Sequence, residues 1–359
     1  MSTVTLIGID LGKHSFHLHG QDSAGRMVFR KMCSRQQVFT LLGNTPCSTV
    51  VMEACAGAHW MARRIQALGH QPKLISPQFV RPFVQGNKKD FADAQAICEA
   101  ASRPSMRFVC VRNEAQQTVS TLHRVRGSLL RERTGVINQV HAFLLEFGIR
   151  LPRGQAILRR LPAVSAEQEL PPRLAALLER LQSHFKYLNE QIGQIERELC
   201  QQLREDERSQ QLLEIPGIGP ITASVLMTEL GDAQQFGSAR QFTASVGLVP
   251  RQYSTGGTPK LLGISKRGDK NLRRLQVQGA RAIIQRVERR TDRLGVWVRE
   301  LLARRHSNVV ACALANKLAR IAWAILANGT NYRSEQAVSA TRPSSPFYAV
   351  TSWFCDAST

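Results

Sequence analysis

Four acidic residues in the first 100 positions have the spacing of a site for phosphoryl transfer. Asp10 and Glu53 each end an apolar run, and Asp90 and Asp93 lie three residues apart, on one face if their segment is helical. A carboxylate beside buried strand residues is costly unless it is paired or used. Four convergent carboxylates can hold divalent ions such as Mg²⁺, which stabilise the attacking and leaving oxygens of a phosphoryl group.

A second pattern suited to phosphate lies at Ile215-Pro216-Gly217-Ile218-Gly219-Pro220, just before an apolar stretch. It matches the loop of a helix-hairpin-helix motif. Gly217 and Gly219 allow a tight turn, and the free amides of the next helix can face a phosphate. A helix connector that contacts no ligand explains the same residues equally well.

The composition indicates a polyanionic partner. The 359 residues include 48 Lys and Arg against 27 Asp and Glu, a net charge of +21, and residues 211–330 contain 18 basic but only 7 acidic residues. Such a balance is typical of proteins that bind nucleic acid. The eight cysteines form no CxxC pair, which favours reduced thiols in the cytosol. No apolar run reaches 18 residues and the N-terminus lacks signal-peptide features, so no membrane segment is expected.

The elements that must position the acids form an α/β domain over residues 1–110. Short apolar runs with Gly, Pro and polar breaks predict three strands, then a strand, a helix, a strand and a helix. The predicted strands are Val4–Ile9, Ser15–His19, Met27–Lys31, Thr49–Met52 and Lys73–Ser76, and the predicted helices are Ala58–Leu68 and Ala92–Ala101.

Residues 111–209 are expected to form a helical insertion. One long helix is predicted over 113–148, ended by Pro152 and Pro162, and a second over about 172–207. Apolar residues in the second recur at alternating steps of four and three from Leu174 to Leu199, which is a heptad pattern. We expect an antiparallel helical hairpin or a dimerising coiled coil, with ordinary globular packing as the alternative.

Residues 210–330 are expected to be mostly helical, with one non-helical segment at 249–267 that contains Gly and Pro. Helices are predicted at 220–230, 239–246, 270–290, 293–304 and 308–327. The Ser/Thr-rich residues 331–359 are expected to be a flexible tail.

The acidic motifs resemble a known family. Gly8-Ile9-Asp10, Glu53-Ala54 and Asp90-Phe91-Ala92-Asp93-Ala94 are similar to the DEDD tetrad of the IS110-family transposases, and more narrowly of the IS1111 group. The resemblance covers about residues 3–330. It implies a RuvC-like RNase H fold for the first domain, with Asp10, Glu53, Asp90 and Asp93 as catalytic ligands of Mg²⁺.

The segments from Val246 to Gly257 and from Ile264 to Asp269 resemble the C-terminal transposase domain of the same family. That resemblance implies a serine nucleophile in a Gly-rich loop, which links covalently to a DNA phosphate. Some relatives have Ser-Gly where this chain has Ser254-Thr255-Gly256-Gly257, so residue type favours Ser254 and distance from the glycine favours Thr255. Neighbouring cations suit either hydroxyl, because they stabilise an alkoxide and bind phosphate.

The resemblance also implies how such a protein works. Family members are recombinases that cut and rejoin DNA strands, guided by a non-coding RNA of their own element that pairs with target and donor DNA. A homo-oligomer, a dimer or tetramer, would combine the acids of one subunit with the serine of another. We expect a bacterial cytoplasmic, nucleoid-associated protein. The residues expected to bind nucleic acid are Lys88, Lys89, Gly217, Gly219, Arg251, Lys260, Lys266, Arg267, Arg273 and Arg274.

Three alternatives stay open at this stage. A metal-dependent Holliday-junction resolvase or nuclease would use the same acids with water as nucleophile and would not need Ser254. A sugar-kinase-like or chaperone-like ATPase would share the phosphate-loop pattern of residues 7–12, but Gly256-Gly257 lacks the preceding Asp of the second phosphate loop. A nucleic-acid-binding protein without catalysis would not need all four acids.

Overall fold

The computed structural model describes residues 3–84, 90–152, 154–168, 170–231 and 233–334. The chain divides into two compact units within helix α7, between Ile195 and Glu196. Each unit has its own hydrophobic core, and each is described by itself.

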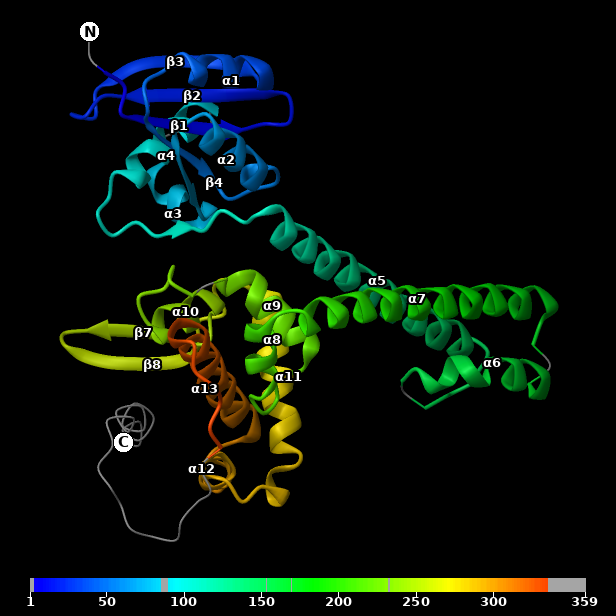
Figure 1. Ribbon diagram of the computed structural model, residues 1–359. Coiled ribbons are helices and arrows are strands. Elements are labelled where there is room, and N and C mark those ends of the chain that lie inside the picture. Colours follow the sequence, from blue (N-terminus) through cyan, green and yellow to red (C-terminus); the bar gives the residue numbers. More distant parts are fainter. Residues whose placement is uncertain (1–2, 85–89, 153, 169, 232, 335–359) are drawn as a thin grey trace, which may run out of the picture. The chain divides into compact units, whose positions relative to one another are not determined.

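The first unit begins with a mixed six-stranded sheet in the order β3-β2-β1-β4-β5-β6 (Figure 1). The β1–β2, β2–β3 and β5–β6 pairs are antiparallel, whereas β1–β4 and β4–β5 are parallel. The strands are β1 (Leu6–Leu11), β2 (Ser15–Gln21), β3 (Met27–Ser34), β4 (Thr49–Glu53), β5 (Gln71–Ile75) and β6 (Phe108–Val109). All five strands expected from the sequence are present.

The central strands are apolar on both faces because helices cover both. Side chains alternate across a strand, so Val51 and Ile75 contact one group of helices and Met52 and Leu74 the other. Helix α4 (Asp90–Ala101) covers the first face, which also receives the short segments α3 (Pro77–Val80) and η1 (Arg81–Phe83). Helices α1 (Arg35–Gly43) and α2 (Ala58–Ala67) cover the second face.

Helix α1 was missed by the sequence analysis because only Val38 and Leu42 of its residues are buried, which leaves little helical periodicity. A start signal was nevertheless present. The Ser34 hydroxyl accepts from the Gln37 amide, while the Gln37 side chain accepts from the Ser34 amide, which is a capping box.

Three helices follow the sheet: α5 (Glu114–Leu145), α6 (Ala156–Glu167) and α7 (Pro172–Arg204). The expectation that Pro162 ends a helix was wrong, since Pro162 lies inside α6. Proline removes the amide that would donate to the carbonyl four residues earlier. That carbonyl, on Leu158, instead accepts from the Gln182 side chain of α7 at 2.5 Å, and the helix continues.

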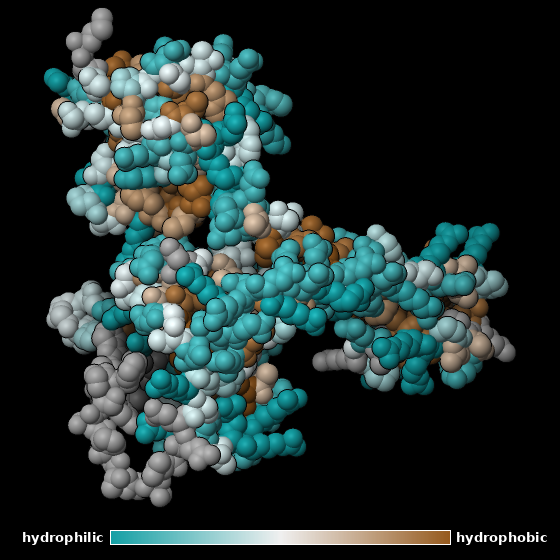
Figure 2. All heavy atoms as spheres, viewed as in Figure 1, coloured by the Kyte–Doolittle hydropathy of each residue, from teal (hydrophilic) through white to brown (hydrophobic). Residues whose placement is uncertain are grey.

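Most heptad side chains of α7 up to Leu188 pack within the first unit. Leu178, Phe185 and Leu188 are buried in one cluster with residues of α5 and α6. Arg133 on α5 donates to the Asn189 side chain on α7 at 2.9 Å, which adds a polar link between the two long helices. Along the face of α7 seen in Figure 2, most side chains are hydrophilic, as expected for an amphipathic helix with one buried stripe.

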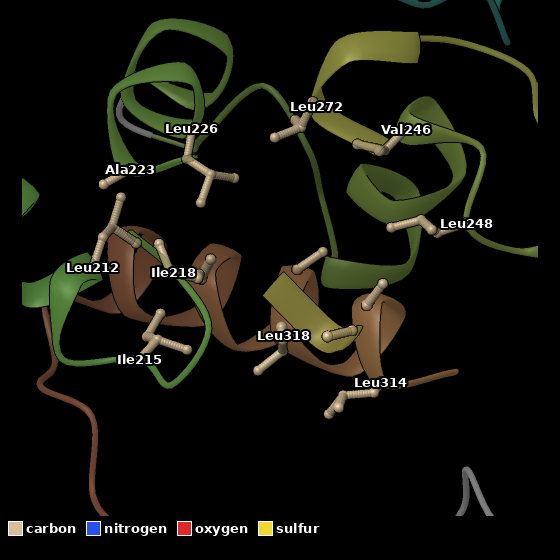
Figure 3. Close-up of a cluster of buried hydrophobic side chains, with 14 of the residues drawn as sticks. Leu212, Ile215, Ile218, Ala223, Leu226, Val246, Leu248, Leu272, Leu314 and Leu318 are labelled. Atoms are coloured by element: carbon tan, nitrogen blue, oxygen red, sulfur yellow. The ribbon is translucent and has the colours of Figure 1, made fainter. Parts of the chain in front are cut away.

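The second unit is mostly helical. Its helices are α8 (Glu207–Leu213), α9 (Pro220–Leu230), α10 (Ala239–Val246), α11 (Lys270–Ile284), η2 (Val287–Arg289), α12 (Arg293–Leu302) and α13 (Ser307–Asn328). Leu314 and Leu318 of α13 lie in the same core as Leu212, Leu226 and Leu272 (Figure 3). By length and mean hydropathy α13 could span a membrane, but half of its most apolar stretch is buried in this core, as in the central helix of a globular domain.

Two expectations for this unit needed correction. The helix predicted over 270–290 ends at Ile284, and a 3₁₀ turn, η2, follows it. The non-helical segment 249–267 is not an open loop but a β-hairpin of β7 (Pro250–Thr255) and β8 (Thr258–Ile264). Gly256 and Gly257 form its two-residue turn with φ of 59° and 80°, the left-handed conformation that tight hairpin turns need. Of the predicted tail, residues 335–359 lie outside the described residues.

The Gly217 loop packs closely on α11. A Cβ on Gly279 would lie 2.0 Å from the Gly217 carbonyl oxygen, and Gly217 itself has φ of 76°. The two backbones therefore touch, and a side chain at either position would separate them.

Gly279→Ala should destabilise the second unit. In a helix interior without close neighbours the same change would be stabilising, because the helix propensity of alanine is better than that of glycine by about 1 kcal/mol. We expect a net loss of about 1–3 kcal/mol from overpacking, measured by urea unfolding. Gly135→Ala is the matched control, because it also lies inside a long helix but has no neighbour within 4 Å of the added Cβ. Equal stability of the wild-type protein and Gly279→Ala would contradict this packing.

Candidate active site

The register of two parallel strands places Asp10 beside Glu53. Ile9 of β1 pairs with Met52 of β4, so the next residues, Asp10 and Glu53, are neighbours at the carboxyl ends of both strands. Both have the same strand parity as Gly8 and Val51, which face α4. The two acids therefore lie at one edge of the sheet, on the side that α4 covers.

Helix α4 brings the other two acids to the same edge. Asp90 and Asp93 lie in its first turn. One carboxylate oxygen from each of Asp10, Asp90 and Asp93 can be chosen so that all three lie within 4.8 Å of one another. Three hard oxygen donors at this spacing fit a divalent cation such as Mg²⁺. Glu53 is not part of this triad but lies next to it through the strand register.

His17 is a site residue to which the sequence analysis gave no role. It is buried on β2, where it pairs with Asp10 across the antiparallel ladder, and its Nε2 lies 3.8 Å from an Asp90 oxygen. Its ring also packs edge-on against Phe91 at 4.7 Å, and the Arg30 guanidinium covers Phe91 at 4.9 Å. These contacts hold the first turn of α4 against the sheet. Strand alternation could have given the face of β2 on which His17 lies, but not its neighbours Asp10 and Asp90.

Cys55 lies two residues after Glu53, and its pKa depends on the charges of the site. Loss of solvation raises the pKa of its thiol, and the carboxylates of Glu53 and Asp10 raise it further. The acids of two different strands therefore act on one atom, which agrees with their convergence. A thiol with a raised pKa is a poor nucleophile at neutral pH.

The two candidate nucleophiles lie near the tip of the β7–β8 hairpin. Ser254 and Thr255 are both exposed and, as successive strand residues, point to opposite faces. The Ser254 hydroxyl accepts from the Gln252 side chain at 2.8 Å. Thr255 shares its face with Tyr253, whose cross-strand partner is Lys260. The two hydroxyls therefore lie on opposite faces of the hairpin.

One of the basic residues predicted to bind nucleic acid, Arg273, instead stabilises the base of the hairpin. Arg273 is only 9% exposed and donates to the Val246 carbonyl at 2.7 Å. Its second acceptor is the carbonyl of Arg267. Gly247 and Gly268 let the chain pass so closely here that a Cβ on either would meet backbone atoms within 2.1 Å. The side chains of Arg251, Lys260, Arg267 and Arg274 are exposed.

The remaining predicted contacts differ in accessibility. Gly217 packs against Gly279, whereas Gly219 is the exposed residue before α9, with no atom within 4 Å of an added Cβ. Lys266 is exposed and has a positive φ of 56°. Lys88 and Lys89 lie outside the described residues.

A cluster of arginines that the sequence analysis did not single out lies where α2 meets the start of α5. Burial, together with the charges of Arg112 and Arg63, lowers the pKa of His59 to about 4. Burial and the charge of Arg126 together lower the pKa of His123 to about 4. The positive charge here therefore comes from the arginines and not from the histidines, and such a cluster of guanidinium groups is suited to phosphate.

Comparison with known proteins identifies the family. A model described as the transposase IS116/IS110/IS902 family matches residues 209–294, and an IS110 DEDD transposase model matches residues 7–149. The transposase for insertion sequence element IS1328 of Yersinia enterocolitica is 62% identical over 92% of this chain and 99% of its own length. The transposase for IS1111A of Coxiella burnetii is 40% identical over 93% of this chain and 92% of its own length. The chain therefore belongs to the IS116/IS110/IS902 family of transposases, DNA-processing enzymes that move insertion sequences.

Proposed function

We propose that this transposase cuts and rejoins DNA strands by transesterification, with Mg²⁺ held by Asp10, Glu53, Asp90 and Asp93 and a hydroxyl of the β7–β8 hairpin as nucleophile. The observation that carries the proposal is the approach of three carboxylates from a strand end and a helix start to within 4.8 Å. Bound Mg²⁺ would stabilise charge on the attacking and leaving oxygens.

The topology supports an RNase H-type reading of the first domain. An antiparallel β3-β2-β1 meander continues into parallel β4 and β5, and the acids come from β1, β4 and the helix packed on them. In this arrangement His17 positions Asp90 and Phe91, while Asp10 and Glu53 are fixed by the ladder. The acids need little reorganisation to receive a phosphate.

The hydroxyl chemistry is a balanced exchange of phosphoesters. The Ser254 or Thr255 oxygen loses its proton and bonds to phosphorus, and a deoxyribose oxygen leaves and takes up a proton. Attack by the hydroxyl of a second strand reverses the step, so the phosphoester bond is conserved without an external energy source. Exposed cations at Arg251 and Lys260 would hold the phosphate backbone.

We further propose that the protein works as a dimer or tetramer with an RNA from its own element that pairs with target and donor DNA. The excess of basic residues and the arginine cluster around His59 and His123 supply sequence-independent backbone contacts. Base pairing would then supply the sequence choice. The alternative is a metal-dependent resolvase or nuclease that uses water.

Asp93→Asn should lower the rate of strand cleavage by roughly 100-fold or more, because it removes a negatively charged metal ligand. The measurement is nicking of DNA that carries the element ends, with Mg²⁺ present. Glu114→Gln is the control, since this acid is 86% exposed at the start of α5, outside the triad. Full activity of Asp93→Asn would remove the triad from the mechanism.

Ser254→Ala should eliminate a covalent protein–DNA adduct, detected as a shifted band on a denaturing gel, while Thr255→Ala retains it. The reverse result would assign the nucleophile to Thr255. Thr258→Ala, on the opposing strand of the hairpin, controls for loss of hairpin structure. Cleavage that survives both substitutions without any adduct would favour the water-dependent nuclease.

RNA that copurifies with the protein, expressed from its own element with both flanks, should be one dominant structured species derived from a flank. Sequencing of the bound RNA provides the measurement. A protein expressed without the flanks is the control. A heterogeneous mixture with no enrichment of flank sequence would contradict guidance by RNA.

A further inference from the structure

Helices α1 and α2, on the face of the sheet opposite α4, carry an interleaved set of arginines and aromatic rings. Arg35 and Phe39 lie four residues apart on one face of α1. Trp60 and Arg64 have the same spacing on α2. Each arginine covers the ring of the other helix: the Arg35 guanidinium lies 5.5 Å from the Trp60 ring centre, and the Arg64 guanidinium lies 5.9 Å from that of Phe39. We call these four residues the Trp60 cluster.

The Trp60 cluster is open to solvent, and the fold does not use its hydrogen-bond donors. Trp60 is 40% exposed, and the side chains of Arg35 and Arg64 are exposed. Contact with a ring face holds a guanidinium in place but leaves its N–H groups free to donate. Within the described part of the chain, neither arginine forms an ion pair or a side-chain hydrogen bond. Helices α1 and α2 contain no acidic residue that would neutralise them.

Exposed rings beside unneutralised arginines fit a single strand of nucleic acid. Every base has a face that can stack on an aromatic ring, and the guanidinium fork matches the oxygens of a phosphate. In a duplex the base faces are covered by the neighbouring base pairs, so only an unpaired nucleotide can use the Trp60 ring. The surplus of positive charge favours such a polyanion over a neutral protein surface.

The Trp60 cluster lies at the same edge of the sheet as the carboxylates. Strand β3 ends at Ser34, which pairs with Ser15 at the start of β2, next to the end of β1. Helix α1 therefore starts at this edge. Helix α2 follows Glu53 after the short loop 54–57, whose residues are all small and of which the last three are exposed. This loop has no large side chain that would keep a strand at the acids from reaching Trp60.

We propose that the Trp60 cluster stacks one unpaired nucleotide of the DNA strand whose reacting phosphate lies at the carboxylates. Trp60 supplies the stacking face, and Arg35 and Arg64 hold the flanking phosphates. A base held in this way cannot pair again with its complement, so the strand stays open beside the cut for transfer. These are positioning residues. The placement beside the cut rests on the proposed function, whereas the stacking of an unpaired nucleotide does not.

The stacking is tested by binding of a fluorescein-labelled thymine decamer to the full-length protein without divalent metal, measured by fluorescence anisotropy. Trp60→Ala should weaken binding by about 5- to 100-fold, the range for loss of one stacked base. Trp60→Phe should retain most of the affinity. Binding of a duplex should be the same in the wild-type protein and Trp60→Ala. Tyr187→Ala, which removes another exposed ring on α7, is the matched control.

Arg64→Gln tests the phosphate contact at an exposed position and does not depend on correct folding of Trp60→Ala. For the thymine decamer, the slope of log K against log salt should become shallower by about 0.7, the value for one lost phosphate contact on a single strand. Arg180→Gln, an exposed arginine on α7, is the control and should keep the wild-type slope.

The placement is tested by photocrosslinking. DNA with the element ends carries 5-iododeoxyuridine at one position at a time, and crosslinked peptides are identified by mass spectrometry. Crosslinks to Trp60 should be confined to one or two neighbouring positions on one side of the cut. Asp93→Asn should keep both the crosslink and the decamer affinity. If Asp93→Asn also kept full cleavage, the metal mechanism would fail while the stacking site stood.

Three results would overturn the proposal. The first is unchanged decamer affinity in Trp60→Ala, and a change of sedimentation in that variant would then identify the surface as a protein interface. The second is an equal loss of single-strand and duplex binding, which indicates general damage or a contact with phosphate alone. The third is the absence of any crosslink to Trp60, or crosslinks spread evenly over all positions of the strand.

Discussion

The close approach of α4 to strand β1 at Gly8 is the constraint on which the catalytic edge depends. A Cβ at position 8 would lie 2.4 Å from the Ala94 carbonyl oxygen and 2.7 Å from the Cys98 sulfur. With hydrogen in that place, the helix lies directly on β1, which carries Asp10 next to its last residue. Its first turn then delivers Asp90 and Asp93 to that strand end. A larger residue would lift the helix away from the sheet and separate acids that must share one cation.

Much of this edge could be predicted from residue order alone. Acids that end apolar runs on parallel neighbouring strands must lie together, since the carboxyl ends of such strands share one edge. Asp10 and Glu53 follow that rule. The contribution of His17 was harder to see, because its partner Asp90 is distant in sequence and depends on where α4 docks. Alternation along β2 gives its face but not its neighbour.

In the second unit, the positive charge of a residue does not by itself predict whether its side chain is free to bind nucleic acid. Arg273 and Arg274 are adjacent in a basic run, yet one is buried against backbone carbonyls and the other is exposed. The sequence could not separate them, since the difference comes from the fold of the hairpin base around Gly247 and Gly268. The hairpin itself was hidden because its strands are largely exposed and lack alternation, although the Gly-Gly turn was a usable signal.

The proline within α6 has a consequence for the order in which the first unit assembles. Leu158 receives its missing hydrogen bond from Gln182, which lies 20 residues beyond Pro162 on another helix. Until α7 docks, the Leu158 carbonyl cannot be both buried and satisfied, which carries a penalty of about 1–3 kcal/mol. Helix α6 is therefore incomplete as an autonomous element. Its formation is thermodynamically coupled to docking of α7, so the two helices should gain protection from amide hydrogen exchange together.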